Sequence, residues 1–258
     1  MSKVHPTAII EDGATLGADV EIGAYSVIGN DVTIGDGTRI ESHVVIKGPT
    51  TIGALNRIYS FASIGDDPQD KKYADEPTTL TIGDRNTIRE SCTINRGTTQ
   101  DRGDTEIGND NWIMAYVHIA HDCVVGDHTI MANNATLAGH VTVGDWAILG
   151  GFSGAHQFCH IGAHSFCGMY SGIGKDVPAY VMVMGQPGVP RGINAEGLKR
   201  RGFSRDAIRN IRDAYKVIYR SNLLLEDAVT ELKARLPEQP ELELLVESIL
   251  RSERSIIR

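Results

Sequence analysis

The sequence predicts an all-β solenoid, a triangular parallel β-helix, followed by a C-terminal α-helical domain. Three observations lead to this fold class: an apolar residue recurs every six positions, glycine with a nearby Asp or Asn often follows it, and a helical pattern replaces both after about residue 200. Apolar residues recur about every 3.6 positions in a helix and every 2 in a strand. A period of six therefore indicates short strands that each send one side chain inward before the chain turns, with three strands in a coil of eighteen residues.

The repeat starts at Ile10 and runs to Ile173 with one slip of a single residue. Its positions are Ile10, Leu16, Ile22, Ile28, Ile34, Ile40, Ile46, Ile52, Ile58, Ile64, Ile82, Ile88, Ile94, Ile107, Ile113, Ile119, Val125, Met131, Leu137, Val143, Leu149, Ala155, Ile161, Cys167 and Ile173. Because Ile64 and Ile82 are eighteen residues apart, we expect the chain between them to occupy one turn with an excursion. The glycines that follow the inward residues, such as Gly35, predict corners with unusual backbone angles.

Two insertions interrupt the repeat, at residues 66–80 and 98–105. Loops that leave a regular solenoid often form its binding face. The first insertion carries Gln69, Asp70 and Lys72, which suit hydroxyls or an anion, whereas the second is more readily interpreted as a tolerated surface loop.

The end of the chain has a different pattern, so we divide the sequence into a β-helix at 1–190 and a helical domain at 191–258. Ser204 is the expected N-cap of a helix with apolar residues on one stripe. Further helices are expected over 224–236 and 241–252, separated by Pro237 and Pro240. Their apolar faces must be covered by the last coils or by a neighbouring subunit.

Composition narrows the class of protein. The formal net charge of −8 disfavours nucleic acid as the main partner. No apolar stretch is long enough to span a membrane, and the N-terminus lacks a signal-peptide core, so we expect a cytoplasmic protein with no integral membrane segment. The four cysteines form no CxxC pair and are expected to be buried, reduced thiols.

Histidines are concentrated in one part of the chain, with seven of the nine between His118 and His164. His121, His140 and His156 are separated by 19 and 16 residues, each close to one coil, so we expect them to lie near one another along one edge of the prism. Imidazole titrates near neutrality and suits proton transfer. His121 is the strongest candidate, because an aspartate follows it and it lies in the middle of the prism.

The repeats, together with the segments QDKKY, HIAHDC, NNATLAGHV, GAHQFC and NAEGLKRRGFS, make the sequence similar to the UDP-N-acetylglucosamine acyltransferase family over essentially its whole length. This resemblance implies a left-handed β-helix, a homotrimer with sites between adjacent prisms, and no cofactor or metal. It also implies transfer of an (R)-3-hydroxyacyl group from the phosphopantetheine of acyl carrier protein to the 3-hydroxyl of UDP-N-acetylglucosamine, the first step of lipid A biosynthesis.

Residue roles follow from the matched motifs. His121 would be the general base, Asp122 would orient it, and the backbone N–H of Gly139 would stabilise the oxyanion. Because neighbouring strand residues point to opposite faces, the pairing of His121 with Asp122 predicts a corner there. The positions implied in substrate binding are Gln69, Asp70, Lys72, His118, His140, His156, Gln157, Asn194, Glu196, Arg200 and Arg201.

One departure from the family concerns the acyl chain. Long-chain members have glycine where this sequence has Met169, at the end of the acyl groove, and Pro187 replaces a histidine that caps it. A methionine side chain fills the space of several methylenes, so Met169 predicts a shorter donor of the 3-hydroxydecanoyl type.

Three alternatives remain open from the residues alone. An N-acyltransferase of a UDP-amino sugar, or a coenzyme A-dependent acetyltransferase, would use the same prism and base. A trimeric β-helix carbonic anhydrase would place histidines on zinc. A structural or ice-binding β-helix would show regular outward Thr or Ser rows, which we expect this chain to lack.

Overall fold

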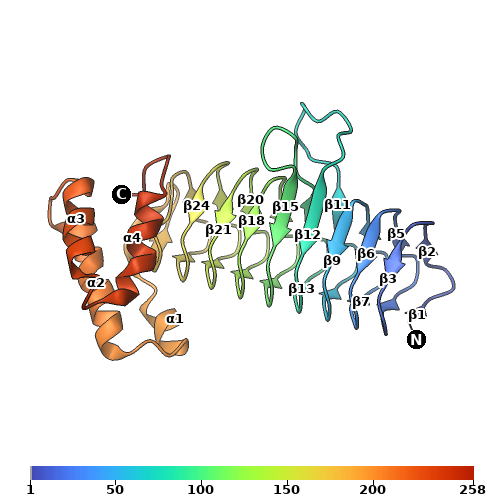
Figure 1. Cartoon of the computed structure of the whole chain (residues 1–258), viewed down its shortest axis with the longest axis horizontal. Helices are drawn as coiled ribbons and strands as arrows, with labels where there is room; N and C mark the ends of the chain where they lie inside the picture. The colour runs from blue at the N-terminus through green and yellow to red at the C-terminus, as the bar shows by residue number, and fades with distance from the viewer. Residues whose placement is uncertain (1) are drawn as a thin grey trace.

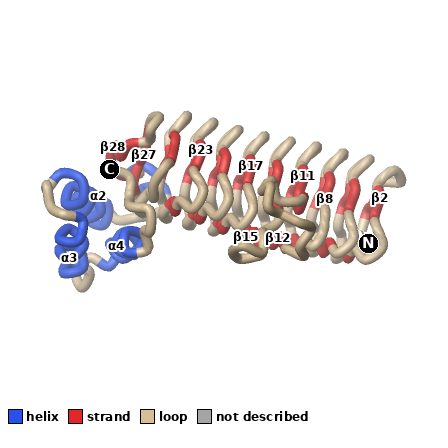
Figure 2. The backbone as a smooth tube through the Cα atoms, turned by 90° about the horizontal axis from the view of Figure 1, so that it is seen from above, coloured by secondary structure: helices blue, strands red, loops and turns tan. Residues whose placement is uncertain are grey.

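The structure is a computed structural model that describes residues 2–258. It confirms the predicted fold class: a left-handed parallel β-helix followed by helices (Figure 1). Seen from above, the strands lie in rows along the prism and the helices gather at its C-terminal end (Figure 2).

The strands form three sheets, which we call faces A, B and C. Face A contains β1 (Lys3–Val4), β4 (Glu21–Ile22), β7 (Arg39–Ile40), β10 (Arg57–Ile58), β13 (Thr87–Ile88), β16 (Trp112–Ile113), β19 (Ile130–Met131), β22 (Ile148–Leu149), β25 (Phe166–Cys167), β27 (Val181–Met184) and β28 (Val189–Ile193). Face B contains β2 (Ile9–Ile10), β5 (Val27–Ile28), β8 (Val45–Ile46), β11 (Ser63–Asp66), β14 (Thr93–Asn95), β17 (His118–Ile119), β20 (Thr136–Leu137), β23 (Gly154–Ala155) and β26 (Gly172–Ile173). Face C contains β3 (Thr15–Leu16), β6 (Val32–Ile34), β9 (Thr50–Ile52), β12 (Thr79–Ile82), β15 (Asp104–Ile107), β18 (Val124–Val125), β21 (Thr142–Val143) and β24 (His160–Ile161). The chain passes from A to B to C, and we name the edges between them the A–B, B–C and C–A vertices.

The aliphatic repeat forms the core, as predicted. On face B, Ile28 pairs in parallel with Ile46, and Ile46 with Ile64, and all three are fully buried. Burying an aliphatic side chain of this size contributes about 1.5–3 kcal/mol, so the stack accounts for much of the stability.

The expectation for the first insertion was wrong in its geometry. Ile64 pairs with Ile94, whereas Ile82 pairs with Ile52 on face C, so Ile82 lies on the next face and not one turn further. A step from one face to the next needs six residues, but eighteen separate Ile64 from Ile82. The extra length is a multiple of six, so the repeat keeps its phase across the insertion. The second insertion lies between the same two faces in the next coil and is not such a multiple, which causes the slip before Ile107.

Many of the corner glycines are required because the neighbouring coil leaves no room for a Cβ, and not because they adopt a positive φ. Gly35 does not have a positive φ, but a Cβ on it would lie 2.5 Å from the carbonyl carbon of Gly53 in the next coil. Many of the positive φ values at the vertices belong to non-glycine residues such as Asp122 (φ 59°) and His140 (φ 64°). The corner conformation was therefore predicted, but among the glycines that follow an inward residue only Gly65 (φ 73°) adopts it in the part of the chain that the structure describes.

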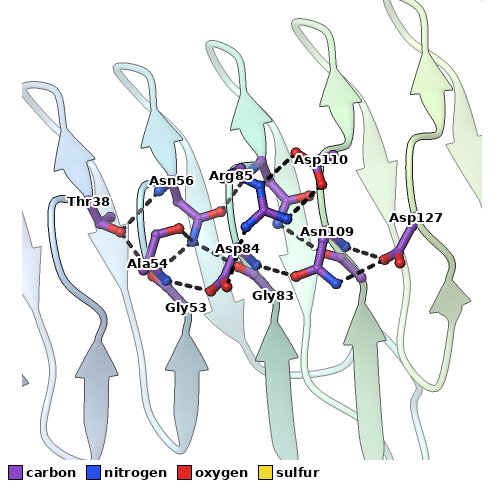
Figure 3. A network of polar contacts seen from close by, with 12 residues as sticks. Thr38, Gly53, Ala54, Asn56, Gly83, Asp84, Arg85, Asn109, Asp110 and Asp127 are labelled. Carbon is purple, nitrogen blue, oxygen red and sulfur yellow. Dashed lines mark hydrogen bonds and ion pairs between the residues drawn. The ribbon is translucent and has the colours of Figure 1, made fainter.

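Asp and Asn side chains connect successive coils at the C–A vertex (Figure 3). The backbone N–H of Ala54 donates to Asp84 (2.7 Å), that of Asp84 to Asn109 (2.8 Å), and that of Asn109 to Asp127 (2.6 Å). Each side chain satisfies a corner amide of the coil before it, which explains why Asp or Asn follows the glycine.

An outward threonine row is present, contrary to expectation. On face C, Thr15, Thr33, Thr51 and Thr81 are paired in register and exposed. A structural β-helix would carry such a row as well, so it is the residues of the site that distinguish an enzyme from a structural protein.

The C-terminal segment contains α1 (Ala195–Arg200), α2 (Arg205–Arg220), α3 (Leu225–Arg235), the 3-10 helix η1 (Pro240–Leu242) and α4 (Glu243–Leu250). Ser204 caps α2 by accepting from the N–H of Ala207, as predicted. The helices pack on the last coil of the same chain, where the Ala179 N–H donates to Ser248 and the Tyr180 hydroxyl donates to the Glu241 carbonyl. The division after residue 190 falls within β28 and stays a prediction.

All four cysteines are buried and free, and burial raises the pKa of Cys92 to about 11. Within residues 2–258, no helix has the length and apolar character needed to cross a membrane.

Candidate active site

The candidate catalytic residues lie on the B–C vertex, in consecutive coils. His121 follows β17, Gly139 and His140 follow β20, and Gln157 follows β23. The coils are joined here by backbone hydrogen bonds, with the His140 N–H donating to the His121 carbonyl (3.0 Å). Both insertions leave the prism at this vertex and project together from its side (Figure 1). The rigid stack therefore places residues distant in sequence around one point.

His121 and Asp122 form a hydrogen-bonded pair. Nδ1 of His121 lies 2.8 Å from Oδ2 of Asp122, and the positive φ of Asp122 provides the corner that this pairing requires. Burial alone would raise the pKa of Asp122, but hydrogen bonds from His121 and Thr98 outweigh it and hold that pKa below its usual range. Because a carboxylate only accepts, the imidazole proton lies on Nδ1 and Nε2 is left as the basic nitrogen.

Gly139 lies directly against the His121 ring. A Cβ at this position would be 2.5 Å from Cε1 and 2.7 Å from Nε2 of His121, closer than atoms can approach. The Gly139 N–H forms no hydrogen bond within residues 2–258. Only glycine therefore leaves room for the imidazole, and an unpaired backbone donor lies beside the basic nitrogen.

His140 makes a second histidine–carboxylate contact. Its Nδ1 lies 2.6 Å from Oδ2 of Asp101, which belongs to the second insertion. The ring stacks on Phe158 with centroids 4.3 Å apart and meets the His121 ring edge-on at 4.9 Å. His140 is thus fixed on both sides beside His121.

A cleft of about 690 Å³ opens in front of this pair. It is lined by Gln69, Asp70, Lys71, Lys72, Gln100, Asp101, His121, His140, Gln157 and Phe158. An adjoining cleft of about 570 Å³ shares Asp101, His140, Gln157 and Phe158 and is also lined by Asp122 and Arg254. The structure thus joins the first insertion to the histidine edge, as the proposed substrate-binding role of Gln69, Asp70 and Lys72 requires.

The first insertion is held in place by a buried arginine. Arg96 is 6% exposed and donates to the Gly65 carbonyl, to Asp67 (2.5 Å) and to the Tyr73 hydroxyl (2.9 Å). Its guanidinium thereby connects the next coil to the loop that carries Asp70 and Lys72.

Two predicted residues lie near the vertex but outside both clefts. His118 is on face B, where its Nδ1 lies 2.7 Å from the Thr93 hydroxyl, and burial, with the charge of His121, lowers its pKa. His156 is at the vertex one coil beyond His140, but its Nδ1 faces Arg254 (3.3 Å). The predicted alignment of His121, His140 and His156 along one edge is therefore confirmed, and the rings of His121 and His140 are in direct contact.

Five predicted residues lie on other vertices. Asn194 caps α1 and donates to the His164 carbonyl (2.9 Å), while the Arg201 guanidinium covers Trp146 at 5.2 Å. Glu196 and Arg200 form an exposed ion pair on the same helix. This group is at the C–A vertex, and Met169, 57% exposed, is at the A–B vertex. A single chain does not bring them to His121.

Some residues at the site were missed by the sequence analysis. Phe158 is one coil after His140, so the eighteen-residue spacing could have identified it. Thr98 and Asp101 lie in an insertion, where the repeat gives no position. Arg254 reaches the site because the C-terminal tail folds back, and its Nη1 donates to the Gln157 carbonyl (2.6 Å).

The side chains of His121, Asp122 and His140 have ligand-type atoms within 4.8 Å of one another. However, Nδ1 of each ring already faces a carboxylate, and Asp122 also accepts from Thr98. The arrangement fits a hydrogen-bonded base better than a metal site, and the absence of a metal requirement stays a prediction.

A β-helical prism with a histidine–aspartate pair facing a polar cleft defines the class: a hexapeptide-repeat acyltransferase. Two family descriptions match, "Bacterial transferase hexapeptide (six repeats)" at residues 104–139 and "Udp N-acetylglucosamine O-acyltransferase; Domain 2" at residues 176–257. The chain is 61% and 58% identical, over the whole of both chains, to proteins of Thiobacillus denitrificans and Pseudomonas entomophila named acyl-(acyl-carrier-protein)–UDP-N-acetylglucosamine O-acyltransferase.

Solved structures agree with these sequence comparisons. The UDP-N-acetylglucosamine O-acyltransferase of Moraxella catarrhalis is 51% identical, with a TM-score of 0.97 and 99% of each chain covered. The UDP-N-acetylglucosamine acyltransferase of Francisella novicida is 43% identical, with a TM-score of 0.97 over 99% of this chain and 94% of that one. The chain therefore belongs to the UDP-N-acetylglucosamine O-acyltransferase family, as the resemblance indicated.

Proposed function

We propose that this chain transfers an (R)-3-hydroxyacyl group from acyl carrier protein to the 3-hydroxyl of UDP-N-acetylglucosamine, the first step of lipid A biosynthesis, in the cytoplasm. The observation that carries the proposal is the His121–Asp122 pair, whose basic nitrogen faces a polar cleft of about 690 Å³ beside a free backbone donor.

The reaction follows from this geometry. The sugar hydroxyl oxygen attacks the thioester carbonyl carbon while His121 Nε2 takes its proton, and Asp122 stabilises the imidazolium. The Gly139 N–H binds the oxyanion of the tetrahedral intermediate. Its collapse breaks the C–S bond, and the imidazolium returns the proton to the phosphopantetheine sulfur. Every step uses protein groups, and no cofactor is required.

Substrate binding divides between two surfaces. Gln69, Asp70, Lys72, His140 and Gln157 line the cleft and suit the sugar hydroxyls. The remaining positions implied by the family, at the C–A vertex and near the cleft, are Asn194, Glu196, Arg200, Arg201, His118 and His156. Of these, the two arginines suit the diphosphate, since guanidinium binds phosphate oxygens in pairs.

A homotrimer would bring these surfaces together. A contact between one vertex of a chain and a different vertex of its neighbour is heterologous, and such contacts form a ring when the rotation between neighbours closes. An apolar row on the outside of face A supports self-association, because Trp112, Ile130, Ile148, Phe166 and Met182 are aligned in register and point away from the core. Acyl carrier protein is strongly acidic, and Lys71, Lys72, Arg102 and Arg254 around the clefts complement it.

The function is tested by acyl transfer with purified protein and carrier-bound 3-hydroxyacyl donors. We expect UDP-N-acetylglucosamine to be acylated and the 3-O-acylated UDP-amino sugar with a free amine to be a poor acceptor. Preference for an amine acceptor would favour the N-acyltransferase alternative, and activity that vanishes with a zinc chelator would favour a metal enzyme. No transfer to any acceptor would refute the proposal.

Met169 is proposed to limit the acyl chain. Part of a path towards it lies on face B, where the outward position Gly154 places no side chain on the surface and a Cβ would meet nothing within 4 Å; at the next position, Gly172, the Gln186 side chain covers the surface. We expect wild type to prefer a ten-carbon over a fourteen-carbon donor, and Met169→Gly to raise the relative kcat/KM for the longer donor at least about tenfold, since one methylene in a hydrophobic pocket discriminates by about 10–200-fold. An unchanged preference in the variant would contradict this role.

A further inference from the structure

The second insertion is fastened to Asp122 at both of its ends. At its start, the Thr98 N–H donates to Oδ1 (2.9 Å) and the Thr98 hydroxyl to Oδ2 (2.6 Å) of Asp122. At its end, the Thr105 hydroxyl accepts from the backbone N–H of Asp122 (2.8 Å). Thr98, Thr105 and Asp122 are each at most 2% exposed. The insertion is therefore built into the catalytic vertex and is not a loop that the surface merely tolerates.

The Thr98 hydroxyl and the His121 imidazole share one oxygen. Both lie within 2.8 Å of Oδ2 of Asp122, while the Thr98 amide holds Oδ1. Three donors on the two oxygens fix the plane of the carboxylate, and hydrogen bonds to an ionised acceptor are the strong ones. The plane of the carboxylate in turn fixes the direction of the Nδ1–H bond, and hence where Nε2 points beside Gly139.

We propose that Thr98 is a positioning residue for the reaction: its hydroxyl sets the orientation and basicity of His121 through Asp122. The inference rests on the proposed function, because it assigns no substrate contact to Thr98. A hydroxyl donor on Oδ2 draws charge from the oxygen that faces the imidazole. Without it, that oxygen attracts the Nδ1 proton more strongly and favours the imidazolium.

Other charged and titratable groups also face the His121–Asp122 pair, and they are the same in wild type and in the Thr98 variants. They are His118, Cys123, His140 and Asp101 on the prism and second insertion, and Asp70, Lys71 and Lys72 across the cleft.

The test compares Thr98→Val, which is close in shape and keeps the amide, with Thr98→Ser, which keeps the hydroxyl. We expect Thr98→Val to lower kcat about tenfold, with little change in KM for the nucleotide sugar, since the carboxylate that orients His121 loses the hydroxyl hydrogen bond on Oδ2. We also expect the acidic limb of the kcat/KM–pH profile to move upward by about half a unit, because the imidazolium is favoured. Thr98→Ser should restore both quantities.

Thr99→Val is the matched control, because the Thr99 hydroxyl bonds the surface residue Glu76 (3.3 Å) and not Asp122. Melting curves check folding, and Thr98→Ala replaces the valine variant if that one melts early. An unshifted acidic limb with wild-type kcat in the hydroxyl-free variant, or a serine variant as impaired as the valine one, would overturn the inference. Inactive wild type would instead overturn the proposed function.

Discussion

His121→Ala is expected to lower kcat for acyl transfer by about 10²–10⁴-fold, the usual contribution of a general base. The Nε2 atom of this ring lies beside Gly139 and the ring lines the cleft, so its loss leaves the sugar hydroxyl without the proton acceptor proposed for it. KM for UDP-N-acetylglucosamine should change little, because the lining residues of the first insertion remain. The measurement is steady-state transfer with saturating donor.

His43→Ala is a suitable control, since His43 is exposed at the A–B vertex and stacks between Tyr25 and Phe61, far from the cleft in sequence and in the prism. His121→Ala also tests whether the active site is shared between neighbouring chains. If the neighbour supplies Arg201, co-assembled His121→Ala and Arg201→Ala chains should regain about a quarter of the wild-type sites, since each ring contact pairs two different vertices. Near-normal turnover of His121→Ala alone would remove His121 from its role.

Gly139→Ala is expected to lower kcat about 10²-fold, because displacement of a catalytic group by about 1 Å has that cost. The added methyl would lie 2.5 Å from Cε1 of His121, so the imidazole must move away from Asp122 or from the cleft. The fold should persist, since the ring faces the cleft and not the aliphatic core. Activity and melting temperature measured on the same preparation separate the two effects.

Gly174→Ala provides the matched change, because it lies at the start of the same vertex in a later coil and a Cβ there meets nothing within 4 Å. We expect it to retain wild-type kcat. Wild-type kcat in Gly139→Ala would mean that the ring relaxes at no cost, and would contradict the close packing as the reason for glycine at this position.

The repeat was sufficient to predict the fold, because a six-residue period allows few structures other than stacked triangular coils. The same period placed His121 and His140 together. The prediction failed at the first insertion. Ile82 follows Ile64 by a multiple of six residues, but it lies on face C whereas Ile64 lies on face B. Phase alone cannot distinguish a full turn from a single step with a long loop.

The site was predictable only where residues lie on the regular coils. Thr98 and Asp101 lie in an insertion, and Arg254 arrives by back-folding of the tail, so no spacing rule reaches them. The residues around Asn194 and Arg201 are a different case. Their segment, NAEGLKRRGFS, was identified from the sequence. The repeat gives positions within one prism, however, and does not say which vertex of a neighbouring chain this segment would contact.

Both excursions begin and end at one edge of the prism, and the inward residues of the flanking strands, such as Ile64, Ile94 and Ile107, stay paired with those of the neighbouring coils. A change in the length of either excursion therefore leaves the aliphatic stack unaltered. Enzymes built on this plan can alter the surface that faces the acceptor by lengthening or shortening these segments, provided that Thr98 and Thr105 keep their hydrogen bonds to Asp122.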